Sequence, residues 1–379
     1  MIIGVLKENT PGEKRVAIIP DSITKLSKLE NIELLVEANI GETIQVSDDI
    51  YKKAGATICD KKKILSSSDI VLKCRKPSSE EISKLKKDSI HISFLDPFNS
   101  PETIKEFSKA NISAISLEMI PRSTIAQKMD ALSSQANIAG YIAVLLAAEK
   151  TSKILPMMMT PAGTINPARV FIIGAGVAGL QAIATAKRLG ARVEAFDTRD
   201  VVEEQVQSLG AKFIKIDLGE TGQTKDGYAK ALTEEQLKMQ REGMAKVCSH
   251  SDIVITTAQL FGRKAPRIIT KDMINRMQPG SVIVDMAIES GGNVEGAELD
   301  KEVKTENGVH IIGLGNLPSK AATASSQMLS NNLTNFIQHF WDKENKTFNL
   351  NLEDDILSNC VITHNGEIIN KLVKEKLGV

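Results

Sequence analysis

The feature that most constrains the fold is a glycine-rich turn near the middle of the chain, between an apolar run and a helix-like stretch. Residues 170–173 read VFII, residues 174–179 read GAGVAG and residues 180–186 read LQAIATA. This is the strand, G-x-G-x-x-G, helix order of the first βα unit of a Rossmann domain. Gly174 would allow the tight turn, Gly176 the approach of a pyrophosphate to the backbone, and Gly179 the packing of helix on strand. The helix N-terminus would offer free N–H groups to the phosphates, so the motif predicts dinucleotide binding.

The next predicted strand, residues 192–196, ends at an acidic residue. Asp197 stands 18 residues after Gly179. An acid at this place accepts hydrogen bonds from the adenosine ribose hydroxyls and repels a 2′-phosphate, which favours NAD(H) over NADP(H). Arg199 follows two residues later. It could pair with Asp197 or touch the adenosine, and it weakens the preference.

Short apolar runs alternate with helix-like stretches along the whole chain, which predicts an α/β fold with parallel sheets. Most of the runs are continuous rather than alternating, as expected when helices cover both faces of a sheet. The predicted strands are residues 2–6, 33–36, 70–74, 90–94, 112–116, 169–173, 192–196, 212–216, 253–256, 282–285 and 309–312.

Two long helical stretches, residues 132–150 and 321–341, could join two halves of the chain. We therefore predict two Rossmann-like domains joined by two long helices, with a ligand-binding cleft between the domains. The first domain would be discontinuous, with residues 1–131 and 322–379, and the second, residues 132–321, would bind the nucleotide. A polar segment at about 218–243 interrupts the second domain. Long loops of this kind are often functional lids, and a surface insertion is the alternative.

Composition excludes several classes of protein. The chain carries 47 Lys and Arg against 47 Asp and Glu, and 42% of its residues are hydrophobic. A disordered chain would be less hydrophobic, and a protein that binds nucleic acid would usually have a basic surplus. No apolar run approaches the roughly 18–20 residues that span a bilayer, and the N-terminus lacks the basic region of a signal peptide. We therefore expect a cytoplasmic chain that is not itself inserted in a membrane.

The sequence lacks the motifs of nucleophilic, phosphoryl-transfer and metal chemistry. It contains no nucleophile elbow, no Walker loop and no H-E-x-x-H, and its four cysteines and five histidines form no cluster with the spacing of metal ligands. We expect no metal site. Hydride transfer by a nicotinamide is then the most economical chemistry, because the cofactor carries the reaction and the protein supplies position.

A polar loop precedes the first long helix. Residues 122–130 read RSTIAQKMD, and Ser133 and Ser134 follow. These side chains could face the cleft at a domain junction, and a solvated loop that ends in a helix cap is the alternative. Two further cations, Arg15 and Lys73, could bind a carboxylate or be solvated ends of strands.

Together these motifs resemble the family that contains alanine dehydrogenase and the NAD(H)-binding alpha subunit of proton-translocating nicotinamide nucleotide transhydrogenase. The likeness is greatest to the split form, in which this portion of the alpha subunit is a separate soluble polypeptide. It extends from residue 7 and EKRVA at 13–17 to the GE pair at 366–367, and its most specific piece is RSTIAQKMDALSSQAN at 122–137. The other matching segments are GAGVAGLQ at 174–181, DTR at 197–199, GYAK at 227–230 and NLPSK at 316–320.

The resemblance implies a nucleotide site for NAD(H). The residues expected at its nicotinamide end are Arg122, Ile125, Gln127, Asp130 and Ser133. The residues expected on the adenosine side, beyond the glycines of the turn, are Val177, Asp197, Thr198, Arg199, Gln259 and Leu260. Gly227 and Tyr228 would lie on a mobile loop that closes over the bound nucleotide.

The resemblance also implies partners. The chain would form a homodimer and assemble with a beta subunit, which holds NADP(H), and with a small membrane subunit, the second portion of the divided alpha subunit. It would lie peripherally on the cytoplasmic face of the inner membrane through these partners. Hydride would pass from NADH on this chain to NADP+ on the partner, and the membrane subunits would couple the transfer to proton translocation.

The alanine dehydrogenase branch is the alternative, and it would make the chain an NAD-dependent amino-acid dehydrogenase. Arg15 and Lys73 match positions that bind the keto acid there. That branch also has a catalytic His just after the fourth strand and an Asp before Gln-Gly-Gly, where this chain reads SFLDP at 93–97 and ESGG at 289–292. Reductive amination needs a proton donor beside the carbonyl, whereas transfer between two nicotinamides needs none. The missing His favours the transhydrogenase branch.

Overall fold

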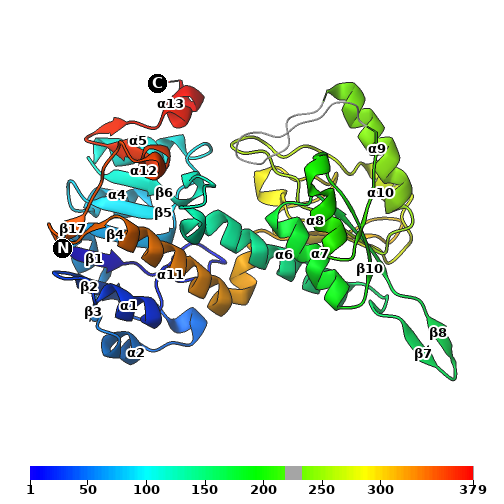
Figure 1. Cartoon of the computed structure of the whole chain (residues 1–379), viewed down its shortest axis with the longest axis horizontal. Coiled ribbons are helices and arrows are strands. Elements are labelled where there is room, and N and C mark those ends of the chain that lie inside the picture. The colour runs from blue at the N-terminus through cyan, green and yellow to red at the C-terminus, as the bar shows by residue number, and fades with distance from the viewer. Residues whose placement is uncertain (218–232, 379) are drawn as a thin grey trace. The chain divides into compact units, whose positions relative to one another are not determined.

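The computed structural model describes residues 1–217 and 233–378 and divides into two compact units (Figure 1). Unit 1 comprises Met1–Gln135 and Pro318–Val379, and unit 2 comprises Ala136–Leu317. The chain crosses from unit 1 to unit 2 within helix α6 (Ala131–Lys150) and returns in the short helix η6 (Leu317–Ala321). The second long helix, α11 (Ala322–His339), belongs to unit 1.

Unit 1 is built on an eight-stranded sheet of order β19-β18-β6-β5-β4-β1-β2-β3. The strands from β3 to β6 are parallel and follow the 3-2-1-4-5-6 order of a Rossmann fold. β18 pairs antiparallel with β6, so the last part of the chain extends the sheet formed by the first part. The strands are β1 (Ile2–Val5), β2 (Glu33–Glu37), β3 (Thr57–Cys59), β4 (Ile70–Arg75), β5 (Ile90–Phe94), β6 (Ser113–Ser116), β18 (Val361–His364) and β19 (Glu367–Ile368). Its other α-helices are α1 (Pro20–Leu26), α2 (Asp48–Lys53), α3 (Lys61–Ser67), α4 (Ser79–Lys84), α5 (Pro101–Lys109), α12 (Asp355–Cys360) and α13 (Lys371–Leu377).

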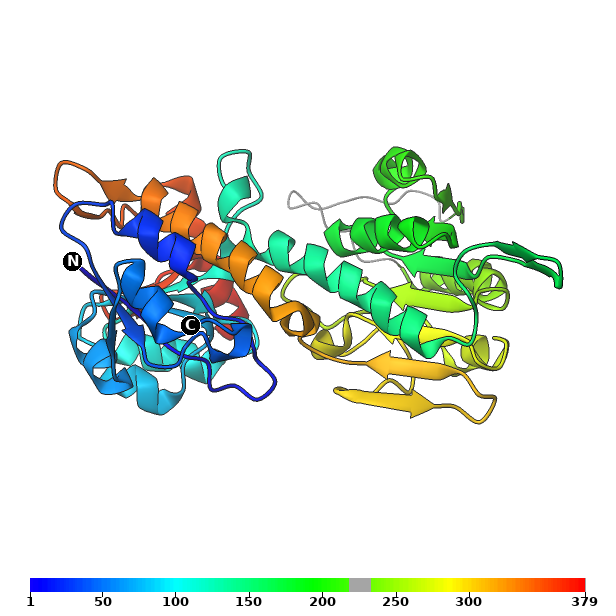
Figure 2. The same ribbon diagram turned by 90° about the horizontal axis from the view of Figure 1, so that it is seen from below.

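Unit 2 has a seven-stranded sheet of order β11-β10-β9-β12-β13-β15-β14, in which β11 to β13 repeat the first five positions of that order. All neighbouring strands in this sheet are parallel except the edge pair, β14 and β15, which is antiparallel. The strands are β9 (Arg169–Ile173), β10 (Arg192–Phe196), β11 (Lys212–Phe213), β12 (Ile253–Thr256), β13 (Val282–Asp285), β14 (Lys301–Lys304) and β15 (His310–Gly313). The α-helices besides α6 are α7 (Val177–Arg188), α8 (Glu203–Ser208), α9 (Glu234–Cys248) and α10 (Lys271–Asn275). A separate hairpin, β7 (Met158–Thr160) with β8 (Gly163–Ile165), projects from this unit in both views (Figures 1 and 2).

Helices cover both faces of the unit 2 sheet, which explains its continuous apolar strands. Phe171, Val254 and Ile283 pack in one cluster with residues of α9 and α10. The residues next to them in the same strands, such as Val170 and Ile172, are also buried. Their side chains point to the opposite face of the sheet, where α7 contacts β9, β10 and β12. The core therefore positions the start of α7 rigidly at the carboxyl end of β9.

Every strand that the apolar runs predicted is present within a few residues, although β11 has only two. The strands that the sequence did not reveal are short or polar. β14, for example, reads KEVK, and three of its four residues are exposed at the sheet edge. An edge strand needs no apolar run, because one of its sides meets solvent.

Helix α6 differs from the expectation that no segment approaches membrane-spanning length. Among the described residues it alone is long and apolar enough to cross a membrane by length and composition, with a mean hydropathy of 1.4 over its best window. Small residues such as Ala and Gly raise the average without forming a continuous run of large apolar side chains. The helix packs against α7, since a Cβ on Gly140 would lie 2.1 Å from the carbonyl oxygen of Ala178. We interpret α6 as a core helix of the fold.

Candidate functional site

The glycine-rich turn connects β9 to α7 in unit 2. Gly174 has a φ of +96°, which L side chains rarely adopt, and a Cβ there would lie 2.4 Å from Oγ1 of Thr257. A Cβ on Gly179 would lie 1.8 Å from the carbonyl oxygen of Gly174. The packing of the protein itself therefore requires both glycines, Gly174 for the turn and Gly179 for the close approach of helix and turn.

Gly176 differs from the other two glycines of the motif. A Cβ added to it would meet no atom of the described residues within 4 Å, and its φ of −78° suits any residue. It is the N-cap of α7, and no side chain of the described residues caps that helix. Nothing in the folding of the turn demands a glycine here. An open backbone at a helix N-terminus fits the pyrophosphate of a dinucleotide.

Asp197 follows β10 and ties this strand to the glycine-rich turn. Its Oδ2 accepts a hydrogen bond from the backbone N–H of Ala175 at 2.7 Å. Arg199 binds the same carboxylate through its side chain, with a distance of 2.8 Å from Nη2 to Oδ2. Of the two alternatives considered for Arg199, the structure contains the ion pair, and this pairing raises the pKa of the guanidinium. Thr198 lies between them and is half-buried.

Gln259 and Leu260 lie just after β12, the other neighbour of β9. Gln259 is exposed, and its Nε2 donates to the carbonyl oxygen of Met286 at 3.3 Å. Parallel strands present their carboxyl ends at one edge of a sheet. The structure therefore brings the predicted residues of the turn, including Val177, to the same edge as Asp197–Arg199 and Gln259.

Two residues that carry no motif in the sequence hold this edge together. Thr257 donates from Oγ1 to the carbonyl oxygen of Gly174 at 3.0 Å, which fixes the turn against β12. Asn293 is fully buried, accepts from the backbone N–H of Ala258 at 3.1 Å and donates to the Ala258 carbonyl oxygen at 2.9 Å. No sequence signal marks a single Thr or Asn as the clamp of a loop.

The polar loop before α6 belongs to unit 1. Asp130 is the last residue before α6, and its Oδ1 accepts from the backbone N–H of Ser133 at 2.8 Å while its Oδ2 accepts from the Ser133 hydroxyl at 2.6 Å. The Nε of Arg122 lies 3.9 Å from Oδ2 of Asp130. Asp130 therefore caps the N-terminus of α6. Ile125 and Gln127 are exposed, with Ile125 at 64%.

Buried neighbours fix the course of this loop. Ala126 and Met129 are fully buried beneath the exposed side chains. The carbonyl oxygen of Lys128 accepts from the side-chain amides of Asn332 and Asn335 in α11, at 3.0 Å and 3.1 Å. The loop is therefore held rigidly on unit 1 and presents polar and apolar side chains to solvent.

Some residues of the expected site lie outside the described residues. Gly227 and Tyr228 fall there, so the predicted closing loop has no structural account. The remainder of the segment 218–243 is helical from Glu234, where α9 begins behind a capping box formed by Thr233 and Gln236.

A network of buried charges occupies the carboxyl ends of β1 and β4 in unit 1. Arg15 is 3% exposed, and its Nη2 lies 2.7 Å from Oε2 of Glu13 while its Nη1 donates to Oε1 of Gln135 at 2.9 Å. Lys73 is fully buried, and its Nζ lies 2.8 Å from Oε2 of Glu81. Burial alone would raise the pKa of each carboxyl, but the paired cation outweighs it, so the pKa of Glu13 is well below its usual range and that of Glu81 falls to about 2.

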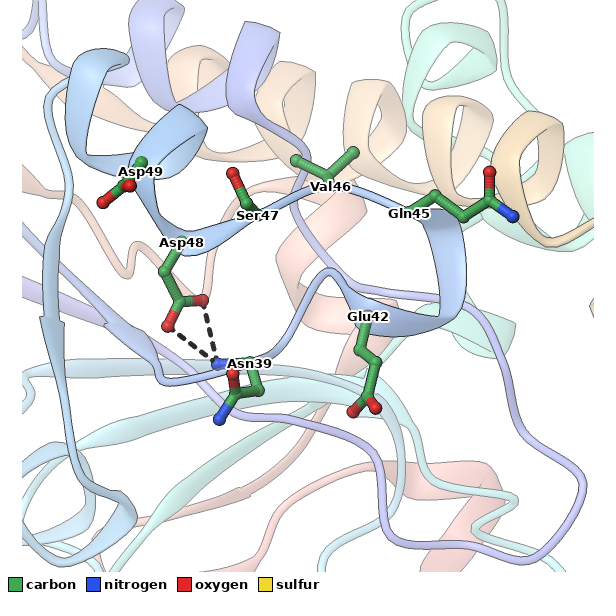
Figure 3. Close-up of a pocket in the computed structure, with 7 residues that line it drawn as sticks. All are labelled: Asn39, Glu42, Gln45, Val46, Ser47, Asp48 and Asp49. Atoms are coloured by element: carbon green, nitrogen blue, oxygen red, sulfur yellow. Dashed lines mark hydrogen bonds between the residues drawn. The ribbon is translucent and has the colours of Figure 1, made fainter.

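One other feature of unit 1 is a pocket with no assigned chemistry. An open pocket of about 510 Å³ beside α2 is lined by side chains that include Glu42, Asp48 and Asp49 (Figure 3). The Asp48 carboxylate accepts from the backbone N–H of Asn39, so it serves the loop locally (Figure 3). No group of three or more His, Cys, Asp or Glu able to hold a metal occurs in the portion of the chain that the structure describes.

The fold and the turn define a class: a two-unit Rossmann protein with a G-x-G-x-x-G turn at the start of its second sheet. Comparisons with known proteins refine this class. The family model described as "Alanine dehydrogenase/PNT, N-terminal domain" matches residues 4–139, and the C-terminal domain model of the same family matches residues 143–371. The chain belongs to the alanine dehydrogenase/PNT family.

Within the family, the chain is more similar to transhydrogenases than to alanine dehydrogenases. It is 43% identical to the first portion of the divided NAD(P) transhydrogenase subunit alpha of Rhodospirillum rubrum, over 98% of both chains. It is 41% identical to the NAD(P) transhydrogenase subunit alpha of Haemophilus influenzae over 97% of this chain and 72% of that one. Alanine dehydrogenase 1 of Staphylococcus aureus is 27% identical over 98% of this chain and 95% of its own.

Solved structures confirm the predicted fold class. The transhydrogenase of Sinorhizobium meliloti matches with a TM-score of 0.85 at 39% identity, over 98% of this chain and all of that one. An L-alanine dehydrogenase matches with a TM-score of 0.83 at 23% identity, over 100% of this chain and 99% of that one, which shows the shared fold. The predicted enzyme class, NAD(P) transhydrogenase, is confirmed by these relatives, and the family implies NAD(H) binding.

Proposed function

We propose that this chain binds NAD(H) in unit 2 and takes part in direct hydride transfer between NADH and NADP+ held by a partner subunit. The observation that carries the proposal is Gly176. It is the one glycine of the motif that the packing of the described residues does not require, and it faces open space at the N-terminus of α7. A ligand whose phosphates approach that backbone explains the glycine, because a side chain would fill the same space.

The chain's own residues would orient and shield rather than exchange protons. When bound, NADH supplies the hydride, which leaves it as NAD+ and reduces NADP+ to NADPH without an accompanying proton. Asp197 would accept ribose hydroxyls at the adenosine end. The loop of Arg122, Gln127 and Asp130 would hold the nicotinamide end, and its exposed side chains rest on the buried anchors Ala126 and Met129 described above. Positioning of this kind contributes to rate without acid–base chemistry.

The charge network in unit 1 argues against an amino-acid dehydrogenase. Arg15 and Lys73 would have to bind a keto-acid carboxylate, yet Glu13 and Glu81 already neutralise them at 2.7 Å and 2.8 Å. A substrate carboxylate would need to displace a buried internal one, which leaves that group uncompensated. The strand β5 also ends in Phe94, whose ring lies 5.7 Å from the Arg15 guanidinium carbon, and offers no imidazole there.

The names of the relatives support the assembly that we propose. The Rhodospirillum rubrum chain is named as one portion of a divided alpha subunit, and the Haemophilus influenzae alpha subunit is longer than this chain's match to it. We propose that this chain is a homodimer that docks with a beta subunit carrying NADP(H) and with a small membrane subunit, the second portion of the alpha subunit. It would then lie peripherally on the cytoplasmic face of the inner membrane, with proton translocation in the partners.

The nucleotide site is tested by Gly176→Ala, with Gly174→Ala as its comparator. Gly176→Ala should leave the free energy of unfolding within about 0.5 kcal/mol of wild type, because its Cβ meets nothing, and should weaken NADH binding about tenfold or more. Gly174→Ala should lose both stability and binding, because its φ of +96° is strained for alanine. Unchanged NADH affinity in Gly176→Ala, measured by fluorescence titration, would refute the cradle.

The reaction is tested by adding a purified beta subunit. The pair should reduce an NADP+ analogue with NADH, and the isolated chain should not. Substantial oxidation of L-alanine by the isolated chain with NAD+ would instead support the dehydrogenase branch.

A further inference from the structure

Arg199 occupies acceptor sites of the Asp197 carboxylate that a ribose hydroxyl would use. Four hydrogen bonds to the Asp197 carboxylate come from protein groups: the backbone N–H of Ala175 and of Arg199, and Nε and Nη2 of the Arg199 side chain. A carboxylate has about four acceptor sites. A ribose hydroxyl therefore cannot bind Asp197 in this state without displacing one of these donors.

The four donors are not equally replaceable. The two backbone donors are held by the main chain, one in the glycine-rich turn and one two residues after Asp197, so neither can leave without a change in backbone conformation. The guanidinium sits at the end of a flexible side chain, and its distances of 2.9 Å and 2.8 Å to Oδ1 and Oδ2 mark a two-point contact. Two adjacent ribose hydroxyls could make the same two contacts, so the guanidinium is the group that must leave.

The pair is also electrically neutral and well shielded. The Asp197 and Arg199 side chains are 6% and 14% exposed. An isolated acid at this position would repel a 2′-phosphate. A carboxylate that is paired with a guanidinium repels the 2′-phosphate less. A guanidinium released from the carboxylate could bind a phosphate in the same two-point geometry.

We propose that Arg199 is a specificity-determining residue: its side chain competes with the ribose for Asp197 and so lowers both the affinity for NADH and the preference for NADH over NADPH. This rests on the proposed NAD(H) site in unit 2. Each nucleotide must displace the Arg199 guanidinium from Asp197 before its ribose can bind. Only NADPH, through its 2′-phosphate, can then bind the displaced guanidinium. Discrimination between the two nucleotides is accordingly weaker than Asp197 by itself would provide.

The test measures NADH and NADPH dissociation constants of the full chain by titration calorimetry, for wild type, Arg199→Gln and Arg199→Lys. Arg199→Gln should bind NADH several-fold more tightly and NADPH more weakly, so that the NADPH dissociation constant divided by the NADH dissociation constant rises at least about tenfold. Arg199→Lys keeps the charge but loses the two-point contact, so its ratio should lie between the other two.

Lys212→Ala is the matched control. It removes one positive charge from the same sheet, in an exposed pair with Glu194 at 3.4 Å, and should leave both constants unchanged. Circular dichroism and urea unfolding show whether each variant is folded.

Weaker NADH binding in folded Arg199→Gln would overturn the inference, because it would mean that the guanidinium contacts the nucleotide directly. A ratio equal to that of wild type would overturn it too. If wild type itself binds neither nucleotide, the proposed function fails and not merely the role of Arg199.

Discussion

The contact between α6 and α7 allows a prediction in which two effects have opposite signs. Gly140 lies in the interior of α6, where glycine costs about 0.8–1.0 kcal/mol relative to alanine by helix propensity. Propensity alone therefore predicts that Gly140→Ala stabilises the protein. The added Cβ, however, would lie 2.1 Å from the carbonyl oxygen of Ala178. Ordinary contacts begin at 3.4 Å, so the two helices must separate by 3.4 − 2.1 = 1.3 Å.

Packing should win this comparison. The obstructing atom is backbone and cannot rotate away, and overpacking a well-filled interior costs about 1–3 kcal/mol. Subtracting the propensity gain of about 1 kcal/mol from this cost, we expect Gly140→Ala to lose up to about 2 kcal/mol in free energy of unfolding. Because Ala178 belongs to the first turn of α7, directly after the glycine-rich turn, NADH affinity should fall as well.

Urea unfolding followed by circular dichroism measures the stability, and fluorescence titration measures the affinity. Asn137→Ala is the control, because Asn137 is exposed on the same helix and should gain about 0.5 kcal/mol from propensity alone. A gain of about 1 kcal/mol in Gly140→Ala would refute the packing argument.

Two further predictions concern unit 1. Burial, and secondarily the charge of Lys73, lowers the pKa of His91 to about 3 in the folded protein from 6.5. The free energy of unfolding should therefore be independent of His91 well above pH 6.5 and should fall by about 1.4 kcal/mol from about pH 7.5 to about pH 5.5, because the unfolded chain takes up a proton there that the folded protein does not. Urea unfolding of His91→Gln should show a loss over this pH range that is smaller by that amount. Equal pH trends in the two proteins would contradict the prediction. At the start of α6, Asp130→Ala should cost about 1 kcal/mol in chemical denaturation because the cap to Ser133 is lost, whereas Asp130→Asn should cost less than about half as much. Equal losses in the two variants would exclude the capping role.

Sequence patterns predicted the parallel strands well because helices cover both faces of each sheet. Burial on two sides requires continuous apolar runs such as 170–173 and 253–256, and these are easy to recognise. Strands such as β14 and β19 lie at edges, where burial is partial and the pattern fades. β18 has only four residues, and its pairing with β6 spans about 250 residues of sequence, a distance over which local patterns carry no information about which strands pair.

Some residues of the candidate site could likewise be predicted from the sequence and others could not. The glycines and Asp197 are recognisable because backbone geometry and ligand chemistry restrict those positions to one or two residue types. Asn293 and Thr257 act through single hydrogen bonds whose partners come from other strands, so nothing in their local sequence distinguishes them. The sequence left the partner of Arg199 open, because pairing with Asp197 depends on a side-chain conformation that spacing does not determine.

The pairing of β18 with β6 has a consequence for the order in which the chain folds during synthesis. Unit 2 is continuous and complete once Leu317 has been made, whereas unit 1 still lacks 379 − 317 = 62 residues. At about 5–20 residues per second, the ribosome needs about 3–12 s to supply them. Throughout that interval the edge of β6 has no partner, and Lys128 has no α11 to hold it. An unpaired strand edge is a template for association with other chains. Residues 1–135 therefore wait longest for their partners, and association with other chains is favoured there until residues 318–364 have been made, whereas unit 2 can already be folded.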